Sequence, residues 1–172
     1  MAVRSSALSV VLALACACGG TAPQAPRPTP AASSDDGLAR VAAIHGAAGP
    51  WAVAGYRMGR YALGKLGLPA QSFDLEVTHH TPEKVQYSCI ADGAAAATGA
   101  SPGKLNLKLV DATDAGVMTT YVKKSTGQAV TLRPTAAFAT RFGDLPRERL
   151  ADAGREVMAL PDAEVFEEVK PP

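Results

Sequence analysis

Apolar residues recur at helical spacing over residues 50–66. Trp51 and Met58 fall on the apolar face, Pro50 suits a first helical position, and Gly67 follows the last apolar residue. We therefore predict an amphipathic helix over residues 50–66.

The polar face and the glycines of this helix give two further expectations. Arg57 and Arg60 are expected on its solvated face. Gly55 and Gly59 would let another backbone approach closely, because glycine has no side chain to hold it off.

A strand is predicted next, because Phe73, Leu75 and Val77 alternate with polar residues. His79 and His80 follow at its end. If the strand extends that far, its alternation directs His79 toward the core and His80 toward the polar side.

The rest of the chain predicts two more helices and three more strands. Four alanines and a following glycine indicate a thin helix, and turn residues separate the strands, of which the last two form a hairpin. The order helix, strand, helix, three strands and C-terminal helix predicts a single α+β domain. The predicted helices are 89–98 and 146–158, and the strands are 105–110, 117–123 and 128–132.

The first residues have the pattern of a secretory leader. Arg4 precedes an apolar run over residues 7–15, which is too short to span a bilayer, and small residues surround Cys16 and Cys18. Ala13-Leu14-Ala15-Cys16 resembles the lipobox of bacterial lipoproteins, and we predict lipidation at Cys16, with Cys18 as a second candidate. A soluble periplasmic protein is the alternative.

The chain thus divides into a leader (1–18), a Pro/Ala/Ser-rich disordered linker (19–37) and a folded domain (38–172). We expect the domain to be exported and held at the bacterial cell envelope, on the periplasmic or outer-membrane face. Lysine plus arginine (17) nearly balances aspartate plus glutamate (16), so nucleic acid is not an expected partner.

Cys89 is the strongest candidate for chemistry. After removal of the leader it has no evident disulfide partner. An unpaired thiol is unusual outside the cytoplasm, so a chemical role for Cys89 is considered. Placed at a helix start, it would be favoured as the thiolate, the form that binds metals and attacks electrophiles. A buried small hydrophobe is the plain alternative.

Three histidines and Asp92 could join Cys89 in a site for zinc, nickel or copper. Each histidine alone is equally consistent with a loop or core position. Residues 99–104 lack the spacing and the Ser or Thr of a phosphate loop, and no hydrolase motif is present.

Several ordered blocks resemble the FmdE family, named after formylmethanofuran dehydrogenase. The similarity runs from Val41 to Arg133 and also covers the C-terminal tail. The blocks are His45-Gly46-Ala47-Ala48-Gly49-Pro50, Gly55-Tyr56-Arg57-Met58-Gly59, Ser88-Cys89-Ile90-Ala91-Asp92-Gly93, Thr98-Gly99-Ala100 and Gly103-Lys104-Leu105-Asn106.

The resemblance implies the same helix, strand, helix, three-strand core, and a metal site between the first and third blocks. Zinc is the first expectation, with nickel or copper as alternatives. The ligands it implies are His45 and Cys89, with His80 as a further ligand. Asp92, Lys104 and Asn106 are implied as polar residues beside the site.

The sequence departs from the family pattern at one ligand. The family commonly reads His-Gly-His, and Ala47 replaces the second histidine. The resemblance does not make the chain a dehydrogenase, because activity does not follow from fold. We predict a metal-binding domain; a metal- or cysteine-dependent enzyme and a metal-free scaffold are the alternatives, and homodimerisation is left open.

Overall fold

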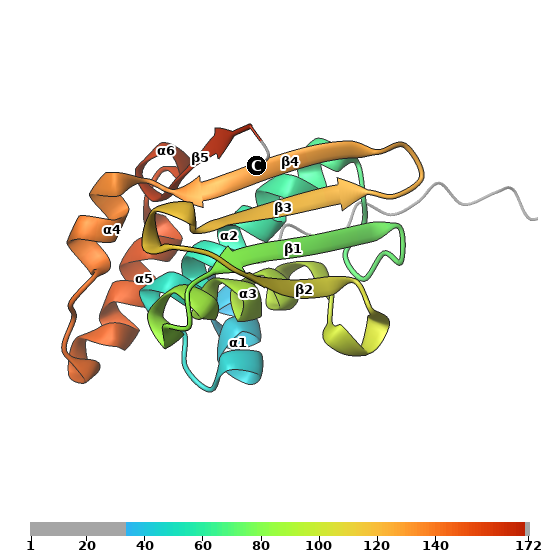
Figure 1. Ribbon diagram of the computed structural model, residues 1–172. Helices are drawn as coiled ribbons and strands as arrows, with labels where there is room; N and C mark the ends of the chain where they lie inside the picture. The colour runs from blue at the N-terminus through green and yellow to red at the C-terminus, as the bar shows by residue number, and fades with distance from the viewer. Residues whose placement is uncertain (1–33, 171–172) are drawn as a thin grey trace, which may run out of the picture. The chain divides into compact units, whose positions relative to one another are not determined.

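The computed structural model describes residues 34–170 (Figure 1). The predicted leader with Cys16, and the linker up to residue 33, lie outside the described residues. The helices are α1 (Ser34–His45), α2 (Pro50–Leu66), α3 (Val85–Thr98), α4 (Ala136–Phe142), α5 (Leu150–Ala159) and α6 (Asp162–Val165), with 3-10 turns η1 (Pro102–Lys104), η2 (Asp114–Gly116) and η3 (Arg147–Arg149). The strands are β1 (Leu75–Thr81), β2 (Leu107–Asp111), β3 (Met118–Lys123), β4 (Gln128–Pro134) and β5 (Phe166–Val169).

The strands form one mixed sheet in the order β2-β1-β3-β4-β5. β1 and β2 are parallel, with Val77 opposite Leu107, and α3 is the crossover between them. The other neighbours are antiparallel, and β3 and β4 form the predicted hairpin. The α+β class is therefore confirmed.

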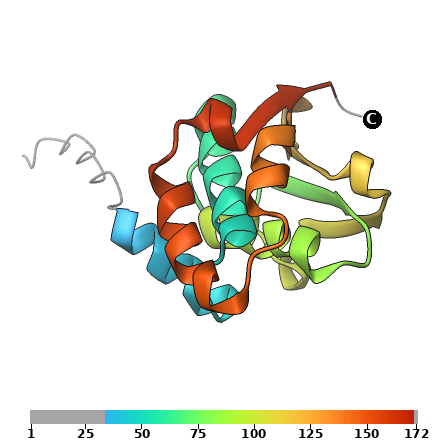
Figure 2. The same cartoon turned by 90° about the vertical axis from the view of Figure 1, so that its left-hand side faces the viewer.

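The helices pack against one face of this sheet, which Figure 2 shows edge-on. α2 and α3 approach so closely that a Cβ on Gly93 would lie 1.8 Å from the backbone oxygen of Ala52. A Cβ on Gly55 would lie 2.1 Å from the oxygen of Ile90. Small residues at these crossings thus allow the two backbones to touch, as expected for Gly55.

The predicted elements agree with the structure in most of the core. α2 matches its predicted range, and Gly67 and Gly99 end α2 and α3 in the left-handed conformation. α3 begins at Val85, four residues before the predicted start. α1, α4, α6 and β5 were not predicted, and residues 34–37, assigned to the linker, are the first turn of α1.

Arg57 was wrongly placed on the solvated face. Its guanidinium donates 2.6 Å to the backbone oxygen of Val157 and pairs with the Asp162 carboxylate, so it ties α2 to the C-terminal segment. Arg60 is exposed, as predicted. Helical periodicity cannot distinguish these two arginines, because the segment that covers Arg57 is about 100 residues away in the chain.

Within residues 34–170, no helix combines the length and the apolar composition needed to cross a membrane.

Candidate functional site

The candidate site lies where the end of α1 meets the first turns of α3. His45 is the last residue of α1, and Gly46 follows it with φ 86°, a left-handed conformation that glycine adopts without strain. A short loop then leads to α2 at Pro50. Because α1 ends there, the His45 imidazole can project beyond the helix toward α3.

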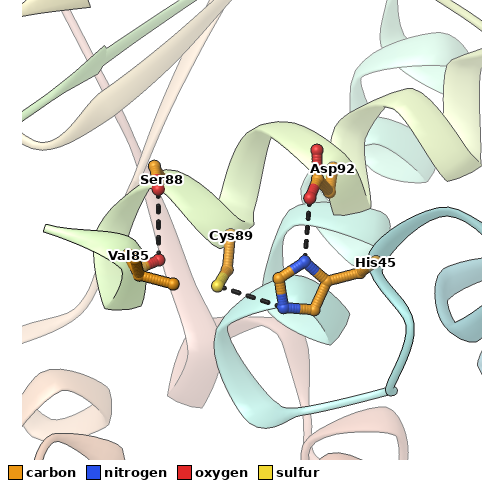
Figure 3. Close-up of polar contacts among 5 residues, drawn as sticks. All are labelled: His45, Val85, Ser88, Cys89 and Asp92. Atoms are coloured by element: carbon orange, nitrogen blue, oxygen red, sulfur yellow. Dashed lines mark hydrogen bonds and ion pairs between the residues drawn. The ribbon is translucent and has the colours of Figure 1, made fainter. Parts of the chain in front are cut away.

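Cys89 and Asp92 lie three residues apart in α3, so both project from the same face of the helix. This face meets α1, and His45 lies between the two side chains (Figure 3). The spacing of Cys89 and Asp92 was visible in the sequence. Their common contact with His45 required the packing of α1, a helix that the sequence analysis did not predict.

The three side chains form a continuous hydrogen-bonded line (Figure 3). His45 Nδ1 lies 2.8 Å from Asp92 Oδ2, and His45 Nε2 lies 3.2 Å from Cys89 Sγ. A carboxylate accepts from Nδ1–H, so this nitrogen carries the proton of the neutral ring. The Nε2 lone pair is then free to face the thiol.

Cys89 is half-buried, and burial raises the pKa of its thiol to about 11, with the nearby Asp92 carboxylate as a second cause. The expectation of a lowered pKa at a helix start is wrong. Cys89 lies a full turn inside α3, where the backbone amides are already hydrogen-bonded. The thiol is therefore protonated at neutral pH unless a cation stabilises the thiolate.

A cavity of about 280 Å³ lies beside the His45–Cys89 pair. Neither the cavity nor its walls can be recognised from local sequence, because the walls come from five separate segments. The lining residues are His45, Gly49, Pro50, Trp51, Ala52, Val85, Gln86, Cys89, Phe142, Gly143, Leu145 and Leu150.

The other two histidines are separated by the alternation of β1. His79 is fully buried; its Nδ1 lies 2.9 Å from Thr119 Oγ1 and its Nε2 lies 3.1 Å from the backbone oxygen of Tyr87. It has a structural role. His80 projects to the opposite face of the sheet from His79 and α3, so the structure does not bring it to His45 and Cys89.

Lys104 and Asn106 have structural contacts elsewhere. Lys104 Nζ donates 2.8 Å to the backbone oxygen of Gly99, at the end of α3, and lies 5.2 Å above the Phe73 ring. Asn106 is buried and donates 3.1 Å to the backbone oxygen of Leu75. Their contacts join η1 and the residue before β2 to neighbouring elements rather than to the His45–Cys89 pair.

The residues present supply two donors suited to a transition metal. Imidazole nitrogen and thiolate sulfur suit zinc, nickel and copper, and two such ligands of a tetrahedral zinc lie about 3.5 Å apart. The 3.2 Å between His45 Nε2 and Cys89 Sγ is close to this spacing. In the described part of the chain, however, no three His, Cys, Asp or Glu side chains are grouped to hold an ion. The pair fits as part of a coordination shell.

The fold and site define a small α+β domain with a carboxylate–imidazole–thiol line at the junction of two helices. The family model described as "FmdE, Molybdenum formylmethanofuran dehydrogenase operon" matches residues 44–167, and the chain belongs to this family. A comparison with curated proteins finds no match. The family resemblance drawn from the sequence is thereby confirmed.

Proposed function

We propose that this domain binds a divalent transition-metal ion, with zinc as the first candidate and nickel or copper as alternatives. His45 Nε2 and Cys89 Sγ are the protein ligands. The observation that carries the proposal is the imidazole whose Nδ1 is held by a carboxylate while Nε2 faces a thiol sulfur. Metal-binding histidines commonly have such a carboxylate on their second nitrogen.

Each side chain has a separate part in this proposal. Asp92 fixes the tautomer and orientation of His45 and makes the ring nitrogen a better donor. Cys89 loses its proton when the ion binds, because a bound cation stabilises the thiolate. With a thiol pKa of about 11, binding should release a proton and strengthen as the pH rises.

Two protein ligands leave coordination positions for water or a small molecule. Zinc sites that hold exchangeable ligands generally have three protein ligands, so the absence of a histidine at Ala47 should lower the affinity. A bound ion would act as a Lewis acid or as a structural link between α1 and α3. We do not assign dehydrogenase activity, because the family description names an operon and not a reaction of this chain.

The metal content of the purified protein tests the proposal. The chain would carry Cys16→Ser and Cys18→Ser, so that Cys89 is its only thiol, and no histidine tag. After zinc loading and desalting we expect about one ion per chain, and its loss in both His45→Ala and Cys89→Ala. His80→Ala is the matched control, because His80 lies on the opposite face of the sheet. A parent that retains no zinc, nickel or copper would contradict the proposal.

We further propose that the domain works outside the cytoplasm, tethered to the envelope by a lipid on Cys16. The support is the sequence pattern of the leader and linker. The double variant Cys16→Ser, Cys18→Ser should leave the membrane fraction. Retention of this variant in the membrane fraction would contradict lipid anchoring.

A cysteine-dependent enzyme is the second candidate, because the same line has the order of a nucleophile, a base and an orienting carboxylate. In such a reaction the Cys89 thiol proton passes to His45 Nε2, and the sulfur forms a bond to an electrophilic carbon. The bond from this carbon to its leaving group then breaks, and His45 Nε2 returns the proton to the leaving group. The raised pKa of Cys89 in the metal-free protein favours the metal proposal over this one.

A further inference from the structure

The cavity beside the proposed metal site has walls from five segments. These segments are the end of α1 at His45, the loop before α2 together with its first residues, the first two turns of α3, and the segments around Phe142 and Leu150. Its volume of about 280 Å³ is near the lower end of small-molecule sites. A molecule of one or two rings fits such a space, whereas a folded partner does not.

Polar side chains are few in this cavity. Among the lining residues, the polar side chains are those of His45, Cys89 and Gln86, together with the indole of Trp51. The other lining residues offer apolar surface or backbone. An apolar cavity in which a few polar groups converge is the usual form of a small-molecule site, since the walls bind the body and the polar groups orient the head.

Aromatic packing holds the Trp51 wall of the cavity in place before any ligand binds. Trp51 Nε1 donates 2.8 Å to the backbone oxygen of Phe142, which ties α2 to the end of α4. The Trp51 ring also meets Tyr87 and Phe138 edge to face, with centroids 5.0 and 5.1 Å apart. A wall held by a hydrogen bond and two ring contacts needs little ordering when a ligand binds.

We propose that this cavity binds a small molecule with a flat apolar body and one bidentate oxygen or nitrogen donor head. The body lies against Trp51, Phe142 and Leu150, and the head faces His45 Nε2 and Cys89 Sγ. The inference rests on the proposed metal site, because two protein ligands leave the ion open to two donors of the head.

Benzohydroxamate and benzamide are matched probes for this inference. They share a phenyl body, but only benzohydroxamate offers two adjacent oxygen donors. Trp51 is the only tryptophan in the chain and lines the cavity, so its fluorescence reports binding of either probe. The protein is the full zinc-loaded chain with Cys16→Ser and Cys18→Ser.

We expect benzohydroxamate to half-saturate the fluorescence change at a concentration roughly tenfold below that of benzamide. The difference should vanish in Cys89→Ala. Leu150→Gln, which places an amide on the half-buried cavity wall, should weaken both probes, while Leu105→Gln, at an exposed residue in another part of the fold, should weaken neither. His45→Ala gives an independent variant if Cys89→Ala does not fold.

The zinc content of the same samples separates the two proposals. If zinc is retained but the two probes bind equally, or neither changes the fluorescence, the cavity inference is overturned and the metal site stands. Loss of zinc from the parent overturns the metal site, and the inference with it.

Discussion

The Nδ1 atom of His45 lies 2.8 Å from the Oδ2 atom of Asp92, although 47 residues separate the two in the chain. The contact joins the last residue of α1 to the second turn of α3. Because the carboxylate holds one ring nitrogen, the other is directed at Cys89. The contact with Asp92 thus sets the orientation of His45 toward Cys89, and the predictions for the site follow from this arrangement.

Asp92→Asn should weaken zinc binding without unfolding the domain. The amide can still meet the ring, but it no longer supplies the negative charge that strengthens His45 as a ligand. Loss of such a partner typically lowers metal affinity by about 10- to 100-fold. Competition with a zinc indicator measures the change, and Asp111→Asn, at an exposed carboxylate on β2, is the control. Equal affinity in parent and Asp92→Asn would show that the contact does not serve the metal.

Alkylation of Cys89 by iodoacetamide should follow its raised pKa. In the metal-free chain with serine at positions 16 and 18, we expect slow reaction near neutral pH and a rate that rises toward about pH 11. Bound zinc should protect the sulfur. A fast, pH-independent rate below about pH 7 would instead indicate a thiolate paired with protonated His45, and would favour the cysteine-dependent enzyme.

Protonation of His79 should destabilise the fold in mild acid. Burial lowers its pKa from 6.5 to about 4, so the unfolded chain takes up the proton first. The free energy of unfolding is not reduced by His79 above about pH 6.5. It falls as the pH drops from 6.5 to about 4, and below that His79 lowers it by about 3 kcal/mol. Urea unfolding of the parent and His79→Gln measures it.

The parent should lose more stability than His79→Gln between about pH 7 and pH 4.5. His80→Gln removes only the smallest of the causes that act on the pKa of His79, so this variant should keep most of the acid loss of the parent. The same acid loss in the parent and in His79→Gln would assign the effect to other groups.

Gly93→Ala should destabilise the domain by about 3 kcal/mol, because its Cβ would overlap the backbone oxygen of Ala52 and force α2 and α3 apart. Gly64→Ala is the matched control: it lies in α2 with open space around its Cα, and we expect it to stabilise by about 0.5 kcal/mol. Denaturant midpoints measure both, and similar stability of the two variants would contradict the close helix contact.

Local pattern was sufficient for the elements that carry their own periodicity or turn residues. Residues 50–66 form the predicted helix, and β3 and β4 form a hairpin around the Thr126-Gly127 turn between them. α1 was missed although Leu38, Val41 and Ala42 recur at helical spacing, because its first four residues were assigned to the linker and its buried face is small. β5 has four residues and follows α6 directly, so its pattern is too short to identify a strand.

The sequence by itself determined the α+β class, the family, and His45 and Cys89 as candidates, because spacing and residue type are local properties. Only the tertiary structure decided which histidine meets the cysteine. The alternation of β1 directs His80 away, and the packing of α1 brings His45 between Cys89 and Asp92. The raised thiol pKa and the cavity also depend on burial by distant segments, which no local pattern encodes.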